Sequence, residues 1–156
     1  MKTITSHSTN ETQALAIKLI QDNWQNLESK CLIFALQGEL GSGKTRFVKG
    51  LGQALRIKEA IKSPTFILVH EHPYSLNSLK NKTALLYHID AWRLDDPQEI
   101  ADLQLEKMLL PGNILAIEWV NKTGNILKEI ANDKNVKIIK VNFQHLSPQS
   151  RKITIT

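Results

Sequence analysis

One octapeptide limits what this 156-residue chain can fold into more than any other feature. Residues Gly38 to Thr45 read Gly-Glu-Leu-Gly-Ser-Gly-Lys-Thr and match the pattern G-x-x-x-x-G-K-[ST]. The apolar run Cys31 to Leu36 precedes the match, and a helical pattern begins at Lys44 and continues to about Leu55. This order of strand, glycine-rich turn and helix predicts a phosphate-binding loop, because backbone N–H groups and the positive end of the helix dipole converge at the turn.

The order of residues within the octapeptide argues against an accidental match. From average composition, such a string should arise on the order of once in a few hundred chains of this length. A tight strand-to-helix turn would account for the glycines but not for Gly43-Lys44-Thr45. The Lys44 ammonium can reach the β and γ phosphates of a nucleotide, and the Thr45 hydroxyl can bind Mg²⁺. The expected nucleotide-binding residues here are Gly38, Glu39, Leu40, Gly41, Ser42, Gly43, Lys44, Thr45 and Arg46.

Two further buried strands end in carboxylates that a magnesium ion could use. Residues 114–118, Ile-Leu-Ala-Ile-Glu, form an apolar run that ends in Glu118, the arrangement that places an acid beside a phosphate-binding loop. Residues 84–90 end in Asp90, and His88 shares its face of the strand. A solvated strand end, or a cap of the next helix, is the alternative for each acid. The expected metal ligands are Thr45, Glu118 and Asp90, and the expected catalytic residues are Lys44, Asp90 and Glu118.

The rest of the chain alternates between strand-like and helix-like segments, without repeats or a long linker. We therefore predict one α/β domain over residues 1–156, a three-layer P-loop NTPase fold whose mixed sheet has a parallel core, an antiparallel hairpin and antiparallel C-terminal strands. The further expected strands are Lys2 to Ser6, Thr65 to Glu71, Thr83 to Asp90, Asn113 to Trp119, Val136 to Phe143 and Lys152 to Ile155, with residues 73–82 as the hairpin loop. The further expected helices are one capped by Thr9 or Asn10 with Leu15, Leu19 and Trp24 on its apolar face, one between Pro97 and Pro111, and one over Ile126 to Ile130.

Composition is typical of a soluble globular protein of a reducing compartment. Hydrophobic residues make up 42% of the chain and charged residues 22%, and Cys31 is the only cysteine. No apolar run approaches the ~20 residues that span a bilayer, and residues 1–11 lack the apolar centre of a signal peptide. We expect a cytoplasmic protein with no membrane partner.

The net charge of +5 is concentrated near the C-terminus. Residues 121–156 hold 7 of the 20 basic residues but only 2 of the 15 acidic ones. A basic surface can attract phosphate-rich partners, but a solvated lysine face that maintains solubility explains the same pattern. No RNA-binding motif accompanies these residues.

Two further patterns suggest sites that the chemistry does not support. Residues 121–124, Asn-Lys-Thr-Gly, look like the guanine-reading Asn-Lys-x-Asp, but Gly124 replaces the acid that would accept the guanine N–H groups. His70 and His72 could face His88 across the expected hairpin, which resembles a zinc site. No cysteine assists, so we do not expect zinc there.

Taken together, the motifs resemble the TsaE family of bacterial P-loop ATPases. The resemblance rests on residues 38–45, Ser63-Pro64-Thr65-Phe66, the run His88 to Leu94 and Ile117-Glu118-Trp119, in that order and spacing, and it spans about Thr12 to Arg151. Members are needed for threonylcarbamoyl modification of adenosine 37 in tRNAs that read codons beginning with A. The resemblance implies a compact mixed-sheet domain that hydrolyses ATP with Mg²⁺, partners of the TsaB and TsaD families, and contact with tRNA only indirectly, through that complex.

The resemblance also implies roles for single residues. The Ser-Pro-Thr segment acts like a switch loop in the family, so Thr65 is expected to sense the γ phosphate. Asp90 falls on the aspartate implicated in hydrolysis, and Glu118 on the magnesium-binding glutamate. Trp119 is either a core residue or a wall of the nucleotide site that excludes water. Arg151 is the best match to a basic residue that lies near the nucleotide in the family.

The chain departs from the family pattern at two places. Trp92 stands where tyrosine is common, which keeps a large aromatic side chain, and Val120-Asn121 replaces a frequent Pro-Glu. No arginine clearly serves as an arginine finger within the chain; Arg93 is a candidate. We therefore expect slow hydrolysis without partners. A small P-loop metabolite kinase, and a nucleotide-gated assembly module with incidental hydrolysis, are the alternative functions.

Overall fold

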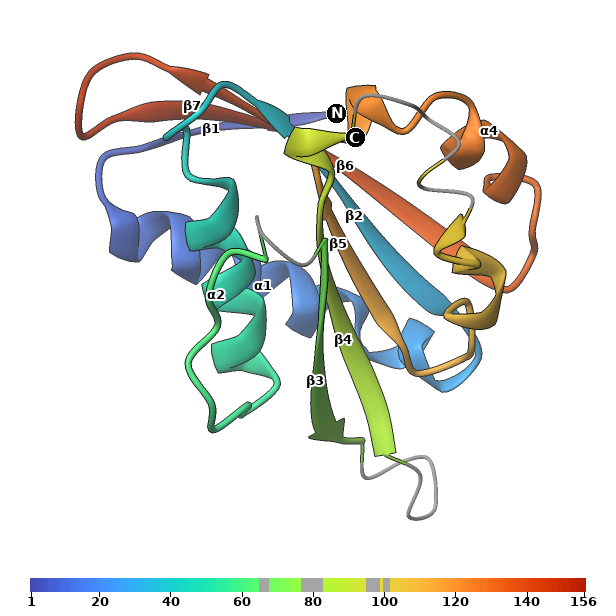
Figure 1. The fold of residues 1–156 in the computed structure, drawn as a ribbon. Coiled ribbons are helices and arrows are strands. Elements are labelled where there is room, and N and C mark those ends of the chain that lie inside the picture. Colours follow the sequence, from blue (N-terminus) through green and yellow to red (C-terminus); the bar gives the residue numbers. More distant parts are fainter. Residues whose placement is uncertain (65–67, 77–82, 95–98, 100–101) are drawn as a thin grey trace.

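A single seven-stranded sheet forms the centre of the computed structural model, which describes residues 1–64, 68–76, 83–94, 99 and 102–156 (Figure 1). The strand order is β1-β7-β6-β2-β5-β4-β3. Strands β4, β5, β2 and β6 run parallel, while β3 at one edge and β7 and β1 at the other pair antiparallel. The strands are β1 (Lys2–Ser6), β2 (Cys31–Gly38), β3 (Val69–Ser75), β4 (Thr83–Asp90), β5 (Ile114–Glu118), β6 (Val136–His145) and β7 (Arg151–Ile155).

Helices cover both faces of this sheet and complete three layers (Figure 1). Helices α1 (Thr9–Asn23) and α2 (Lys44–Ala54) lie on one face, and α4 (Ile126–Ile130) lies on the other. The predicted α/β class, with a parallel core and antiparallel additions, is therefore confirmed. Short 3-10 helices connect the elements: η1 (Trp24–Glu28), η2 (Ala91–Arg93), η3 (Leu105–Lys107) and η4 (Val120–Lys122).

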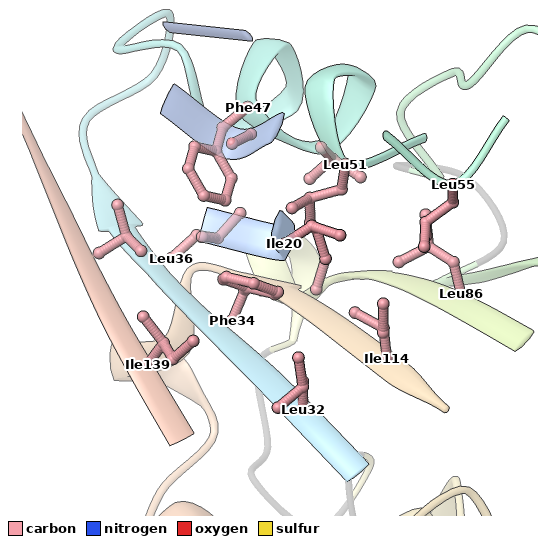
Figure 2. Packing of buried hydrophobic residues seen from close by; sticks show 14 of the residues in the cluster. Ile20, Leu32, Phe34, Leu36, Phe47, Leu51, Leu55, Leu86, Ile114 and Ile139 are labelled. Atoms are coloured by element: carbon pink, nitrogen blue, oxygen red, sulfur yellow. The ribbon is translucent and has the colours of Figure 1, made fainter. Parts of the chain in front are cut away.

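A hydrophobic cluster between α1, α2 and the sheet fixes the start of α2 relative to the strands. Phe47, in the first turns of α2, points toward the strand that carries Phe34 and Leu36 (Figure 2). Its ring makes edge-to-face contacts with Phe34 at 5.7 Å and Phe143 at 5.8 Å between centroids. Because these side chains are fully or almost fully buried, the helix cannot tilt without opening the core.

Several boundaries differ from the sequence prediction. Ser8, rather than Thr9 or Asn10, caps α1, because its hydroxyl accepts a hydrogen bond from the backbone N–H of Glu11 at 3.1 Å. Strand β3 continues through Pro73 to Ser75, into the segment predicted as the hairpin loop. Because it is an edge strand, it can lack the one ladder N–H that proline removes.

Trp24 lies in η1 rather than on the apolar face of α1, and 36% of its surface is exposed. Residues 65–67 of the expected third strand and the Pro97 start of the expected short helix lie outside the described residues. The strand predicted over Asn113 to Trp119 is present as β5, one residue shorter at each end, and the helix over Ile126–Ile130 is present.

Helices α1 and α2 approach each other closely at Gly50. A Cβ atom there would lie 2.5 Å from the backbone oxygen of Gln13 and 2.8 Å from Cβ of Ala16, both on α1. Real Cβ atoms do not come this near to backbone atoms, so glycine is required by the packing of the two helices.

Replacing Gly50 by alanine should lower the free energy of unfolding by about 1–3 kcal/mol, because overpacking outweighs the ~1 kcal/mol that alanine gains in helix propensity. Urea denaturation followed by circular dichroism measures the change. Gly52→Ala on the same helix is the control, since its Cβ would meet chiefly Cδ1 of Ile61, the end of a flexible side chain. A G50A protein at least as stable as wild type would contradict this account of the contact.

Candidate functional site

The predicted phosphate-binding loop joins the end of β2 to the start of α2. Gly38, Gly41 and Gly43 have φ values of +152°, +75° and +109°. Gly43 is the N-cap of α2, and in its left-handed conformation a side chain would be strained. A Cβ there would also lie 3.3 Å from Cδ of Arg151. The loop therefore presents the N-terminal backbone of an 11-residue helix, and among the described residues no side chain forms a cap hydrogen bond there.

Lys44 is buried at the first position of α2 and is held by the loop itself. Its Nζ donates hydrogen bonds to the carbonyl oxygens of Gly38 at 2.8 Å and Glu39 at 2.9 Å. The same atom lies 3.9 Å from the centroid of the Trp119 ring. Burial lowers the pKa of Lys44 below its ordinary value, and the nearby carboxylates of Glu118 and Asp90 oppose that shift by favouring the ammonium.

Thr45, the next residue, connects α2 to the end of β5. Its hydroxyl donates a hydrogen bond to Oε1 of Glu118 at 2.8 Å. The same oxygen lies 2.9 Å from Nε2 of His88, on β4. Glu118 is 3% exposed and His88 is wholly buried. One oxygen of Glu118, at the end of β5, therefore contacts side chains from both α2 and β4.

Asp90 lies beside Glu118 because β4 and β5 pair in parallel with these two residues in register. One oxygen, Oδ1, accepts the backbone N–H of Trp92 at 3.0 Å, and the other, Oδ2, accepts the Ser63 hydroxyl at 3.0 Å. The first contact caps η2, so Asp90 does cap the next helix, as the alternative interpretation of this acid expected. Asp90 also lines the cleft described next, so the cap does not remove it from the site.

Lys44, Thr45, Asp90 and Glu118 line a cleft of about 400 Å³. Of the predicted residues, Gly38 and Glu39 line a neighbouring cavity of about 440 Å³ instead, and Ser42 lines neither. Thr65 lies outside the described residues. The residues that line the 400 Å³ cleft are Leu40, Gly41, Gly43, Lys44, Thr45, Arg46, Ser63, Asp90, Trp92, Glu118 and Trp119.

Arg151 lies next to Gly43 of the loop and does not line the cleft. Its Nη1 donates to Thr12 Oγ1 at 2.9 Å and to the Ser8 carbonyl oxygen at 3.2 Å, and Nη2 donates to the Gln149 carbonyl oxygen at 3.1 Å. The guanidinium thus joins the start of α1 to the start of β7, next to Gly43. Arg93 is exposed in η2 and is not among the residues that line the cleft.

Three residues of the site, Ser63, His88 and Trp92, belong to motifs named in the sequence analysis but were not among its predicted site residues. The rings of Trp92 and Trp119 pack with centroids 4.4 Å apart at one wall of the cleft. Trp119 has φ of +59°, an uncommon value for a bulky side chain, which directs the chain out of β5. The spacing of His88 and Asp90 was the available signal for His88, since both had been placed on one strand face.

The oxygen groups in the cleft could hold a magnesium ion. The Thr45 hydroxyl and the Glu118 and Asp90 carboxylates are hard oxygen donors, which Mg²⁺ prefers. Among the described residues, no group of three or more His, Cys, Asp or Glu side chains could hold a metal by itself. Mg²⁺ retains several waters and shares its remaining ligands with substrate phosphates, so a site with few protein ligands suits it.

The histidines of the hairpin are used otherwise. His70 faces His88 in the β3–β4 register, but His72 Nδ1 lies 2.7 Å from Oε1 of Glu59. Residues 121–124, which resemble the guanine-reading motif, lie just after β5. The end of the same strand carries Glu118 to the cleft.

A further cavity, of about 820 Å³, lies between α4, β2 and β6 on the opposite face of the sheet, and none of the predicted site residues lines it. No helix in the described part of the chain is long and apolar enough to cross a bilayer.

Known proteins similar in sequence to this chain are named for tRNA threonylcarbamoyladenosine biosynthesis. Residues 6–153 match the family model for threonylcarbamoyl adenosine biosynthesis protein TsaE. The tRNA threonylcarbamoyladenosine biosynthesis protein TsaE of Nostoc sp. is 45% identical over 92 residues, 56% of this chain and 51% of that protein. Its namesake in Rickettsia conorii is 33% identical over 152 residues, 97% of this chain and 75% of that protein. The match thus spans about half the length of the Nostoc relative.

The fold is also similar to that of a solved structure. The crystal structure of Bacillus subtilis YdiB superposes with a TM-score of 0.60 at 22% identity, over 99% of this chain and 83% of that one. This likeness supports the architecture of the sheet and helices. Since the family model covers almost all of the sequence, the chain belongs to the TsaE family, which takes part in tRNA threonylcarbamoyladenosine biosynthesis.

Proposed function

We propose that this protein is a magnesium-dependent P-loop ATPase that supports threonylcarbamoyl modification of adenosine in tRNA. One observation carries the proposal. The start of α2 and the end of β5 bring Lys44, Thr45 and Glu118 to the lining of one cleft, where the Thr45 hydroxyl donates to the Glu118 carboxylate. A cation, a hydroxyl and an acid at a helix N-terminus are the groups that bind the phosphates of a nucleotide and the ion that accompanies them.

The phosphates would take the place of the loop carbonyls around Lys44. In the structure its ammonium is satisfied by the oxygens of Gly38 and Glu39. Phosphate oxygens are stronger acceptors because they carry charge, and the N–H groups at the start of α2 add further donors. The burial that disfavours an isolated ammonium would then strengthen its attraction to the phosphates.

Thr45 and Glu118 would hold Mg²⁺, directly or through water, and Asp90 would orient the attacking water. When bound, the ion neutralises charge on the β and γ phosphates. Asp90 is suited to its task because its backbone register fixes it next to Glu118. Trp92 and Trp119 would limit the access of other water molecules along one wall.

The protein would act in the cytoplasm with partners of the TsaB and TsaD families, and would reach tRNA through that complex. None of the described residues that line the cleft, apart from Arg46, is an arginine. A partner could therefore supply the charge that stabilises the transition state. Thr65, by the family resemblance, would report the presence of the γ phosphate to such a partner.

Lys44→Ala should weaken Mg-ATP binding by about 10- to 100-fold, the loss typical of one or two charge-assisted hydrogen bonds. Isothermal titration calorimetry measures the affinity. Lys49→Ala removes a lysine from the same helix outside the cleft and should bind as wild type does. Unchanged affinity in Lys44→Ala would show that the phosphates bind elsewhere.

Two substitutions at Asp90 distinguish its structural role, capping η2, from its proposed role in orienting the attacking water. Asp90→Asn keeps an oxygen for the Trp92 N–H, so its free energy of unfolding should stay near that of wild type, whereas Asp90→Ala should lose about 1 kcal/mol. Both variants should lose ATP hydrolysis if the carboxylate orients water. Chemical denaturation and phosphate release are the measurements. An Asp90→Asn protein with the full hydrolysis rate would reduce Asp90 to a structural cap.

Hydrolysis should be slow for the isolated protein and should rise by up to ~10³-fold or more when TsaB- and TsaD-type proteins are added. The comparison of phosphate release with and without the partners tests this expectation. Equal rates would remove the partner-completed site. Transfer of phosphate to an added metabolite would identify a kinase, and partner binding that needs ATP but not its hydrolysis would identify an assembly module.

A further inference from the structure

His88 is a fully buried titratable side chain in contact with the site, and the proposed chemistry does not use it. It lies on β4 two residues before Asp90, on the face of the sheet that α2 covers. Its register partner on β5 is Ala116, so its ring reaches past a small side chain toward Glu118. A hydrophobic residue would fill the same space without a polar atom to satisfy.

The contacts of Glu118 are strongly asymmetric between its two oxygens. Oε1 lies 2.8 Å from the Thr45 hydroxyl and 2.9 Å from His88 Nε2. Oε2 accepts no hydrogen bond from the described residues, and Glu118 lines the cleft. Two contacts on one oxygen restrict rotation of the carboxylate and leave the other oxygen for a ligand.

The direction of the hydrogen bond follows from the chemistry of the acceptor. An ionised carboxylate can only accept, so the Nε2 atom of His88 carries the hydrogen. The other ring nitrogen, Nδ1, is buried without a partner among the described residues. The ring is thus tethered to the site by one hydrogen bond, the one to Glu118.

We propose that His88 is a positioning residue that orients Glu118, and through it Thr45, for Mg²⁺. This inference rests on the proposed function. The Thr45 hydroxyl has one hydrogen and two lone pairs, so donation to Glu118 directs its lone pairs away from that carboxylate. His88 holds the carboxylate in the orientation that makes this possible. Partners of this kind behind a metal ligand commonly change metal affinity by about 10- to 100-fold.

A matched pair of variants separates this role from simple packing. In His88→Gln the amide nitrogen can take the place of Nε2, whereas in His88→Asn the shorter side chain reaches only to the level of Nδ1. The two variants are both neutral amides. We expect His88→Asn to need at least about tenfold more Mg²⁺ than wild type for half-maximal enhancement of ATP binding. The Mg²⁺ concentration that His88→Gln needs should stay within about threefold of the wild-type value.

The measurement is a Mg²⁺ titration of ATP affinity by calorimetry, with binding in EDTA as the reference. Affinity without Mg²⁺ should be the same in all three proteins, since the hydrogen bond of His88 is to Glu118 and not to the phosphate-binding loop. The same Mg²⁺ requirement in His88→Asn and His88→Gln, with normal binding by wild type, would overturn the inference alone. A wild-type protein that binds no nucleotide would overturn the proposed function and this role together.

A second measurement needs no substitution and serves if the variants fail to fold. Long-range ¹H–¹⁵N correlation spectra of the wild-type protein assign the hydrogen on the His88 ring. We expect it on Nε2 and protected from exchange with water, because that nitrogen is buried against Glu118. A ring with its hydrogen on Nδ1 alone would overturn the contact, and with it the inference.

Discussion

Parallel pairing of β2, β5 and β4 is the constraint on which the site depends. In this arrangement Leu36, Glu118 and Asp90 lie level with one another, just before the loop that starts α2. The carboxyl ends of neighbouring parallel strands lie at the same end of the sheet, so polar residues there lie close to the start of the helix that follows. The core contact of Phe47 with Phe34 then sets the distance from that helix to the acids. The site is therefore a consequence of the sheet and needs no separate scaffold.

The charged groups of the cleft tolerate burial because each of them has polar or aromatic partners. Lys44 donates hydrogen bonds to two carbonyl oxygens and lies over an indole ring. Glu118 accepts hydrogen bonds from a hydroxyl and an imidazole, and Asp90 accepts them from a hydroxyl and a backbone N–H. In a medium of low polarity such contacts are strong, and the loss of one partner is costly. Each contact also aims a side chain. The proposed exchange of loop carbonyls for phosphates would use a lysine that is already in position.

The sequence was sufficient where one segment determines its own structure. The glycine pattern around Gly43, the apolar run before Glu118 and the helix at Ile126–Ile130 each follow from local signals, and the structure has them. Contacts between distant segments were not accessible in this way. The pairing of His88 with Glu118 depends on strand register, and the Arg151 guanidinium binds α1 residues that lie far away in the chain.

The exchange of ligands at Lys44 is the central claim, and a crystal structure with Mg²⁺ and a non-hydrolysable ATP analogue tests it most directly. The account predicts that the phosphates lie at the N-terminus of α2, that Nζ of Lys44 leaves the Gly38 and Glu39 carbonyls for phosphate oxygens, and that the ion lies beside Thr45. A nucleotide bound at another surface, with Lys44 still on the loop carbonyls, would contradict it.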